Sequence, residues 1–315
     1  MKIFVYGITT IFLTVFIVQS VRSQTKVSNH EIVLQNDNDV YLFTAQDRYY
    51  TNGININYRI GLKLDTTKVK NRILDIEFGQ KMYNGVDLKL DQKIKWDRPF
   101  AGYLYVSGEF NQYHKNDQVW SLKVELGQVG PLAQGEKVQE VIHDIFNMYH
   151  VSGWKDQISN ELGVDVGIKY QKLFYRSKNK NFEISAIGSA TLGMNHTNTG
   201  FSVPIRWGYL RSFDQSVFTK GHVNSQSNSK ELFLYYTPSV NFHLYNATLQ
   251  GGLGKRDPIK ELYQIENVIV NHKIGCMVAN KKSSFGLSYI FQSTEERKML
   301  YKTHQYGSIF YGLRF

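Results

Sequence analysis

The sequence is poor in cysteine and proline, and beyond its first residues it has no long apolar run. Cys276 is the only cysteine, which excludes a disulfide framework and a cysteine-rich zinc site. A bundle of transmembrane helices is also excluded, because each helix needs about 20 consecutive apolar residues. No G-x-S-x-G, H-E-x-x-H or P-loop motif occurs, so three common classes of enzyme do not fit. The 21 Tyr, 19 Phe and 4 Trp argue against a disordered chain.

The N-terminus predicts export. Lys2 precedes a mostly apolar stretch, 3–18, and Val21-Arg22-Ser23 is similar to a cleavage site, so we expect 1–23 to be a signal peptide. An N-terminal membrane anchor is the alternative. The 315 residues carry a net charge of +10. Because an exported protein rarely meets nucleic acid, we expect no nucleic-acid partner and expect the charge to face lipid phosphates or acidic glycans.

Along the rest of the chain apolar and polar residues alternate, which is typical of β-strands. Many stretches exceed the about 9–11 residues that a tilted strand needs to cross a membrane. The twelve stretches are 31–37, 51–64, 73–84, 102–113, 118–129, 162–175, 181–196, 200–211, 231–246, 262–279, 284–294 and 305–315. The chain ends on Phe315, and an aromatic end is typical of bacterial outer-membrane barrels. We therefore predict one domain, 24–315, that forms an all-β, twelve-stranded antiparallel transmembrane barrel.

The connections between these stretches differ in length. Those expected at the periplasmic side are short, except 212–230, whose Ser, Asn, Gly and Gln content predicts a flexible loop. Most connections on the other side are longer, although 197–199 is short. The longest, 130–161, contains an amphipathic pattern from Gly135 to His150 that predicts a helix, with Gln139 and His143 on its polar flank.

Two groups of residues suggest chemistry at the end with long loops. Asn36, Asp37, Asn38 and Asp39 offer oxygen ligands for a hard cation such as calcium, although Asn and Asp also dominate ordinary turns. His143 could serve as a general base near neutral pH, or it could be a surface histidine on a polar helix flank. From these residues alone both readings stay open.

Seven segments together carry a family resemblance. They are Leu34–Asp37, Asp47–Gly53, Gln80–Tyr83, Asp97–Gly102, Gly130–Pro131, Gln139 with His143, and Trp154 with Gln157. In order and spacing they resemble the outer-membrane lipid A 3′-O-deacylases, the LpxR-like family. The second half of the chain resembles the family only as a barrel. The resemblance implies a twelve-stranded barrel that removes the 3′-linked acyloxyacyl chain of lipid A with the help of Ca²⁺.

The resemblance also implies roles for particular residues. Asn36 and Asp37 match the family's active-site pair, and Thr51 matches its threonine at the start of the second strand. His143 matches the catalytic histidine, which would activate water in the manner of secreted phospholipase A2. Asp37 and Thr51 would contact Ca²⁺. Tyr149 departs from the family's type member, which has glutamate there, so the metal shell is only partly matched.

Basic residues near these segments are expected to contact the phosphates of the substrate. The candidates are Arg48, Lys89 and Arg98. The predicted protein is a monomer in the bacterial outer membrane, with lipid A or lipopolysaccharide as its partner and its active site facing the outer leaflet. Two alternatives remain: a non-enzymatic barrel, such as a small pore or an adhesin, and an outer-membrane phospholipase.

Overall fold

A computed structural model describes residues 29–42, 48–64, 68–88, 95–147, 149, 151–224, 230–253 and 262–315. The predicted signal peptide, 1–23, and Lys89 lie outside these ranges. Within them, no helix has the length and apolar character needed to cross a membrane.

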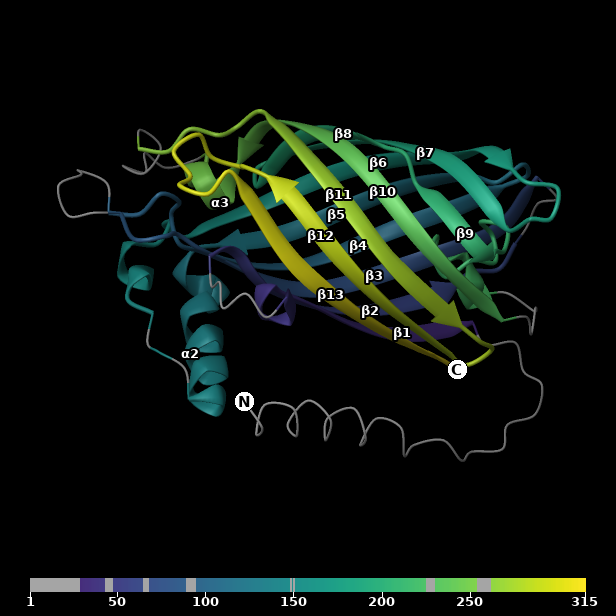
Figure 1. The fold of residues 1–315 in the computed structure, drawn as a ribbon, viewed down its shortest axis with the longest axis horizontal. Helices are drawn as coiled ribbons and strands as arrows, with labels where there is room; N and C mark the ends of the chain where they lie inside the picture. The colour runs from purple at the N-terminus through teal and green to yellow at the C-terminus, as the bar shows by residue number, and fades with distance from the viewer. Residues whose placement is uncertain are drawn as a thin grey trace.

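The described residues form one antiparallel sheet that closes on itself (Figure 1). Its strands are β1 (His30–Asn38), β2 (Tyr49–Gly61), β3 (Val69–Asn84), β4 (Ala101–His114), β5 (Gln118–Val129), β6 (Glu161–Arg176), β7 (Phe182–Gly193), β8 (His196–Ser202), β9 (Ile205–Tyr209), β10 (Glu231–Asn246), β11 (Val268–Ala279), β12 (Ser283–Ser293) and β13 (Thr303–Arg314). The barrel closes where β1 pairs with β13, from Glu31 opposite Arg314 to Asn38 opposite Gly307.

The predicted number of strands in the wall is confirmed. Strands β8 and β9 each pair with both β7 and β10, so they share one position and the wall has twelve positions. Pro204 lies between them, and proline has no N–H to donate to a neighbouring strand. The break therefore interrupts one strand of a twelve-stranded barrel.

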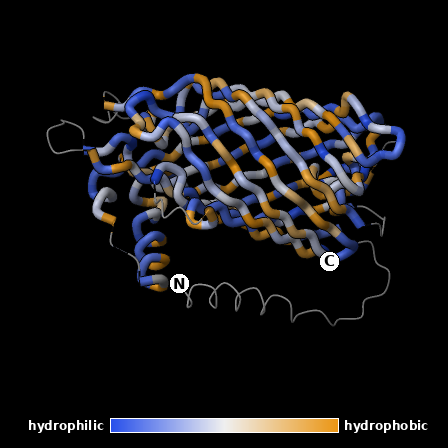
Figure 2. The backbone as a smooth tube through the Cα atoms, in the orientation of Figure 1, coloured by the Kyte–Doolittle hydropathy of each residue, from blue (hydrophilic) through white to orange (hydrophobic). Residues whose placement is uncertain are grey.

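Hydrophilic and hydrophobic residues alternate along the strands (Figure 2). This alternation separates a polar lumen from an apolar outer surface. On β2, Ile54 and Ile56 are exposed on the outside, while Asn55 and Asn57 are buried inside.

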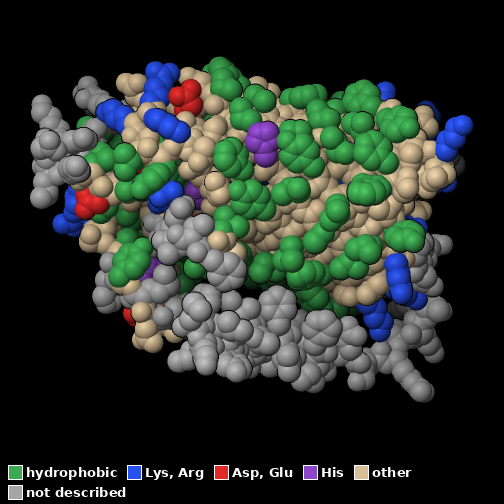
Figure 3. All heavy atoms as spheres, viewed as in Figure 1, with side chains coloured by type: hydrophobic (Ala, Val, Ile, Leu, Met, Phe, Trp, Pro, Cys, Tyr) green, Lys and Arg blue, Asp and Glu red, His purple; other side chains and the backbone are tan. Residues whose placement is uncertain are grey.

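Figure 3 shows that hydrophobic side chains cover much of the visible wall, while Lys and Arg gather toward its two ends. An exposed apolar belt with a polar interior is the pattern of a transmembrane barrel.

The two ends of the barrel differ. At one end, which we call the terminal end, β1 begins and β13 ends, and the His30 N–H donates to the Phe315 carbonyl at 3.2 Å. The opposite end, which we call the helix end, carries the short helices η1 (Asp39–Leu42), η2 (Pro131–Ala133), η3 (Gly153–Asp156) and α3 (Ala247–Gln250), together with α2 (Gly135–Phe146). The predicted helix is confirmed but ends earlier, because Asn147 adopts a left-handed conformation that stops it.

The connection predicted to be a flexible loop is packed inside the barrel over its described part, 212–224. Phe213, Val217 and Val223 are almost fully buried, and the segment includes η4 (Gly221–Asn224). Asn71 donates to the carbonyls of Asp214 and Gly221 at 3.0 and 2.7 Å. Over 212–224 the prediction was wrong, because apolar side chains among the polar residues hold this part in the lumen. Residues 225–229, whose composition also led to the prediction, lie outside the described residues.

Salt bridges join the buried segment 212–224, which we call the plug, to the barrel wall. Lys220 contacts Asp75 at 2.7 Å and Glu109 at 3.0 Å, and Arg59 lies 3.2 Å from Asp75 and 2.8 Å from Glu31. Burying these charges is tolerable because each has an opposite charge beside it. The terminal end of the lumen is therefore filled by a connected network of side chains.

Two strand boundaries also needed correction. The strand expected over 262–279 begins at Val268, and Tyr263 instead packs in the loops, where its hydroxyl donates to the Trp96 carbonyl at 3.2 Å. The connection expected at 197–199 lies within β8, because the chain turns earlier, where the Asn195 N–H donates to Asp165 at 2.8 Å.

Candidate active site

Strand geometry places Asn36 and Asp37 on opposite faces of the wall. Ile32 and Leu34 are exposed on the outer surface, and Asn36 follows at the same two-residue period. Asp37 is 8% exposed and lines a polar lumen cavity of about 290 Å³. The predicted pair therefore offers an amide outside the barrel and a carboxylate inside it.

Two side chains hold the Asp37 carboxylate. The Tyr50 hydroxyl donates to Oδ2 at 2.9 Å, and the Gln35 amide donates to Oδ1 at 3.0 Å. Gly53 pairs with Asp37 across the strands, and a Cβ on Gly53 would lie 1.9 Å from the Tyr50 hydroxyl oxygen. Glycine at position 53 therefore leaves the space through which Tyr50 reaches Asp37.

On the outer face, Asn36 is fixed from both sides. Its amide donates to the Gly53 carbonyl at 3.0 Å, while its carbonyl oxygen accepts from the hydroxyl of Tyr41. Burial, and then the charge of Asp37, raises the pKa of Tyr41, so the hydroxyl stays protonated and able to donate. The side chain of Tyr41 lies against Gly307 of β13, where a Cβ would come within 2.8 Å of the Tyr41 Cβ.

Thr51 lies at an irregularity in the pairing of β2 with β3. Tyr50 opposes Tyr83 and Asn52 opposes Met82, which leaves Thr51 without an opposite residue. Its side chain is 3% exposed, and its hydroxyl oxygen has no hydrogen-bond partner among the described residues. A buried hydroxyl without a partner lowers the free energy of unfolding by about 1–3 kcal/mol. A ligand that accepted from or bound to this hydroxyl would remove that penalty.

Helix α2 is docked on the outside of β3 and β4. The Gln80 amide of β3 donates to the Ala133 carbonyl, just before the helix, at 2.7 Å. Gly102 of β4 lies against Gly135 at the start of the helix, where a Cβ would meet the Gly135 nitrogen at 3.1 Å. One turn later the Trp154 indole N–H donates to Gln139 at 2.7 Å, and both side chains are buried. These contacts explain why glycine and glutamine recur in this part of the sequence.

His143 follows Gln139 on the same flank of α2. It is 5% exposed, and its Nδ1 lies 2.6 Å from the carbonyl oxygen of Tyr149. Because a carbonyl can only accept, Nδ1 carries the hydrogen in the neutral imidazole, and Nε2 is the nitrogen that can accept a proton. The backbone of Tyr149 thus orients the ring where the type member of the resembled family has glutamate.

The exposed side of α2 carries apolar as well as charged residues, and the polar flank expected at the surface is buried instead. Gln139 and His143 are buried against the protein, while Val141 and Ile145 are 57% and 67% exposed. Val138 and Ile142 of the same apolar stripe pack against the cluster that contains Trp154. The stripe is therefore shared between the protein and the exposed side, where a helix beside a membrane can place apolar side chains.

The structure gives the three basic candidates different places. The Arg48 guanidinium lies over the Tyr301 ring, 3.4 Å from its centroid. Lys89 lies outside the described residues. Arg98 is fully buried, donates to Thr248 at 3.0 Å and lies 3.3 Å from Glu295. The predicted contact of Arg98 with substrate phosphates does not fit this burial.

Arg98 and Asp97 instead connect the loops of the helix end. Burial alone would raise the pKa of Glu295, but Arg98 reverses this and holds it below its ordinary value. Asp97 accepts from the Tyr49 hydroxyl at 2.7 Å and from the Leu300 N–H at 2.8 Å. Sequence reasoning missed this structural role, although both residues lie in the segments that carry the resemblance.

The predicted site residues fall into two groups, one in the barrel wall and one on helix α2. Asn36, Asp37 and Thr51 lie on the paired strands β1 and β2, while His143 lies on the helix that covers the adjoining strands. None of the described hydrogen bonds joins His143 to the other three. The arrangement provides an oriented imidazole beside exposed apolar side chains, and a cluster of side-chain oxygens that could bind a metal ion in the neighbouring wall.

Comparison with known proteins identifies a family and similar solved structures. The family described as outer membrane protein LpxR matches residues 9–315. No curated protein sequence matches. The structure of LpxR from Salmonella typhimurium, 20% identical, aligns with a TM-score of 0.74 and covers 90% of this chain and 100% of that one. The β domain of a Bordetella autotransporter, 9% identical, reaches a TM-score of 0.48 over 92% and 99% of the two chains. The chain thus belongs to the LpxR family of outer-membrane proteins.

Proposed function

We propose that this protein is a calcium-dependent ester hydrolase that removes the 3′-linked acyloxyacyl chain of lipid A. The observation that carries the proposal is the setting of His143. Its imidazole is held in one tautomer on a helix that is docked outside the barrel and exposes apolar side chains beside it. Family membership supports the same chemistry.

His143 acts as a general base in this proposal. Its Nε2 takes a proton from water, and the water oxygen attacks the carbonyl carbon of the ester. The ester bond then breaks, and His143 returns the proton to the sugar oxygen that leaves. The products are a carboxylic acid and a free hydroxyl on the sugar. The hydrogen bond from Nδ1 to the Tyr149 carbonyl keeps the correct nitrogen directed at the water.

The oxygen donors of β1 and β2 fit a hard cation chemically. Asp37 supplies a carboxylate, and Thr51 supplies a buried hydroxyl oxygen that has no partner among the described residues. Bound calcium would supply positive charge to stabilise the negative oxygen that develops on the ester. Asn36 can donate a hydrogen bond from the outer face if it releases the Gly53 carbonyl.

The surface around His143 suits a lipid substrate. Val141, Ile145 and Leu132 are more than half exposed and continue the apolar outer surface of the barrel. Acyl chains bound there would bury apolar area at about 25 cal/mol per Å². Arg48, stacked on Tyr301, is the described basic candidate for a phosphate contact. We place this surface at the outer leaflet, where lipopolysaccharide resides.

The filled lumen weighs against a pore. Plug residues 212–224 close the terminal end, and their salt bridges reach the wall at Asp75 and Glu109. A phospholipase remains the second candidate, because an apolar helix beside an oriented histidine would serve any ester lipid.

Mass spectrometry of lipid A treated with the refolded protein separates these candidates. The protein in detergent is incubated with lipid A and, in parallel, with phosphatidylethanolamine, each with Ca²⁺ and then with EDTA. The proposal predicts loss of one acyloxyacyl unit from lipid A, only with Ca²⁺. Release of fatty acid from phosphatidylethanolamine instead would favour the phospholipase. An unchanged lipid A spectrum from a heat-modifiable, folded barrel would contradict the proposal.

A further inference from the structure

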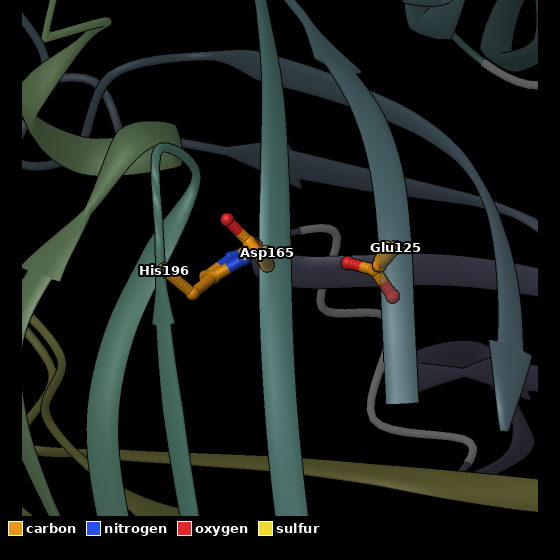
Figure 4. A group of neighbouring side chains, drawn as sticks. All are labelled: Glu125, Asp165 and His196. Carbon is orange, nitrogen blue, oxygen red and sulfur yellow. Dashed lines mark hydrogen bonds and ion pairs between the residues drawn. The ribbon is translucent and has the colours of Figure 1, made fainter. Parts of the chain in front are cut away.

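A group of side chains of the types that can bind a metal ion lies in the lumen and does not include Asp37 or Thr51. Glu125 of β5, Asp165 of β6 and His196 of β8 point toward one another (Figure 4). Each offers one ligand atom, and these atoms all lie within 4.8 Å of one another. Glu125 and Asp165 are buried, at 8% and 3% exposed, so water screens their charges poorly.

The two carboxylates are forced together by the register of the sheet. Glu125 and Asp165 are directly opposite each other in the pairing of β5 with β6, and both face the lumen. Like charges at opposed positions destabilise a sheet unless positive charge neutralises them. Lys123 lies 2.6 Å from Glu125, and His196 Nδ1 lies 3.1 Å from Asp165 Oδ2. Lys81 also places positive charge near Glu125. Among the described residues, the salt bridge of Asp165 is with His196 and not with a lysine or arginine, so the region beside Asp165 favours a cation.

A separate observation points to a missing ligand. Asn195, the residue before His196, is 0% exposed, and neither its amide oxygen nor its amide nitrogen has a partner among the described residues. Its side chain lies over Gly163, where a Cβ would come within 2.7 Å of the amide oxygen. Gly163 lies two residues before Asp165 and faces the same side of β6. The backbone N–H of Asn195 also donates to Asp165 at 2.8 Å.

Leaving a buried amide unpaired is costly, and protein interiors seldom do so. The Asn195 side chain could supply an oxygen to a bound ion or a hydrogen bond to a water on that ion. Outer contacts also hold the group in place, because the Tyr103 hydroxyl donates to Glu125. Such contacts orient ligands in known metal sites.

We propose that Glu125, Asp165 and His196 bind a divalent transition metal, such as Zn²⁺ or Mn²⁺, inside the barrel. The imidazole decides the class of metal, because Ca²⁺ and Mg²⁺ prefer oxygen ligands only, whereas Zn²⁺ and Mn²⁺ accept nitrogen with carboxylates. Binding uses the Nδ1 lone pair of neutral His196, with its hydrogen on Nε2, and replaces the present contact with Asp165. The ion cross-links β5, β6 and β8 near the helix end and does not depend on the proposed lipid A activity.

The test uses the mature protein refolded without a histidine tag and dialysed against EDTA. Calorimetric titration with ZnCl₂ and with MnCl₂ measures binding, and the melting temperature is followed in parallel. We expect one transition-metal site per barrel and a rise in the melting temperature with metal, because an ion that binds only the folded state stabilises it. CaCl₂ at the same concentration should leave this site empty.

Three variants locate the site. His196→Ala and Asp165→Asn should weaken metal binding by more than about 100-fold, because even changes in outer contacts cost about 10–100-fold. His272→Ala is the matched control, since His272 lies on another strand, β11, where it contacts Tyr236 at 2.7 Å, and it should bind as the wild type does. Heat-modifiable migration on gels verifies that each variant folds.

Absence of binding to the wild-type barrel would overturn the proposal. So would wild-type affinity in a folded His196→Ala or Asp165→Asn variant. If Asp165→Asn does not fold, His196→Ala alone decides, because removing the imidazole leaves the opposed carboxylates and Lys123 in place.

Discussion

The indole N–H of Trp154 donates a 2.7 Å hydrogen bond to the side-chain oxygen of Gln139. Both residues are buried, and Trp154 also packs edge-on against Phe100 at a ring distance of 5.4 Å. This contact ties α2 to the loop that follows it. His143 lies four residues after Gln139 on the same flank, so its position depends on the same anchor.

We predict that Gln139→Leu loosens α2 and lowers hydrolysis while leaving the barrel folded. Leucine removes the acceptor and leaves a buried indole N–H unpaired, which costs about 1–3 kcal/mol. Hydrogen exchange of 135–146 and the rate of acyl release measure the effect. Glu140→Ala, on the exposed face of the same helix, is the control and should change neither. Normal exchange and a normal rate in Gln139→Leu would show that the Gln139–Trp154 hydrogen bond does not position His143.

Thr51 allows a test of the calcium site with two conservative variants. Thr51→Val removes the hydroxyl but keeps the shape, and we expect it to raise the calcium concentration needed for half-maximal hydrolysis. Thr51→Ser keeps the hydroxyl and should behave nearly as the wild type does. If the hydroxyl contacts nothing, Thr51→Val should instead stabilise the protein and leave the calcium titration unchanged.

A substitution at Gly53 tests whether the hydrogen bond from Tyr50 holds Asp37 in place for calcium binding. In Gly53→Ala the new Cβ would lie 1.9 Å from the Tyr50 hydroxyl oxygen, so Tyr50 must move and its bond to Asp37 is lost. We expect the same weakened calcium dependence in Tyr50→Phe, which lacks the hydroxyl. Gly108→Ala is the matched control, because a Cβ there meets nothing within 4 Å. Unchanged calcium titrations in both Gly53→Ala and Tyr50→Phe would show that Asp37 needs no such support.

The plug should make the barrel a poor conductor. In planar bilayers we expect little steady conductance from the wild-type protein, because Phe213, Val217 and Val223 fill the terminal end of the lumen. Replacing 212–224 by a short Gly-Ser linker should raise the conductance. A wild-type barrel that conducts as an open pore would contradict this account and return weight to the pore hypothesis.

The sequence predicted the barrel well because its physics is periodic. A strand in a membrane barrel must alternate polar and apolar residues along its length. The outward position of Ile54 and Ile56 and the inward position of Asn55 and Asn57 could therefore be predicted from the order of residues alone. The helix at Gly135 was readable for the same reason, since its apolar residues recur at helical spacing.

Features that depend on distant partners could not be read in this way. The burial of Arg98 follows from Glu295 and Thr248, which are far along the chain. The packing of 212–224 follows from the space inside the closed barrel. The exposure of Val141 and Ile145 on α2 follows from the contact of Gln139 with Trp154, which fixes the flank that faces the protein. Of the site, residue types and strands were predictable, and the opposite faces of Asn36 and Asp37 follow from strand alternation. The irregular pairing at Thr51, in contrast, required the strand register.

The most direct test of the central claim is the rate of lipid A deacylation in His143→Ala, with His272→Ala as the matched control. Both variants should insert as heat-modifiable barrels, since neither residue belongs to the buried network of the lumen. The account predicts that His143→Ala loses about 10²–10⁴-fold in rate at saturating Ca²⁺, the usual contribution of a general base, while His272→Ala keeps the wild-type rate. A folded His143→Ala variant that hydrolyses lipid A at the wild-type rate would contradict it.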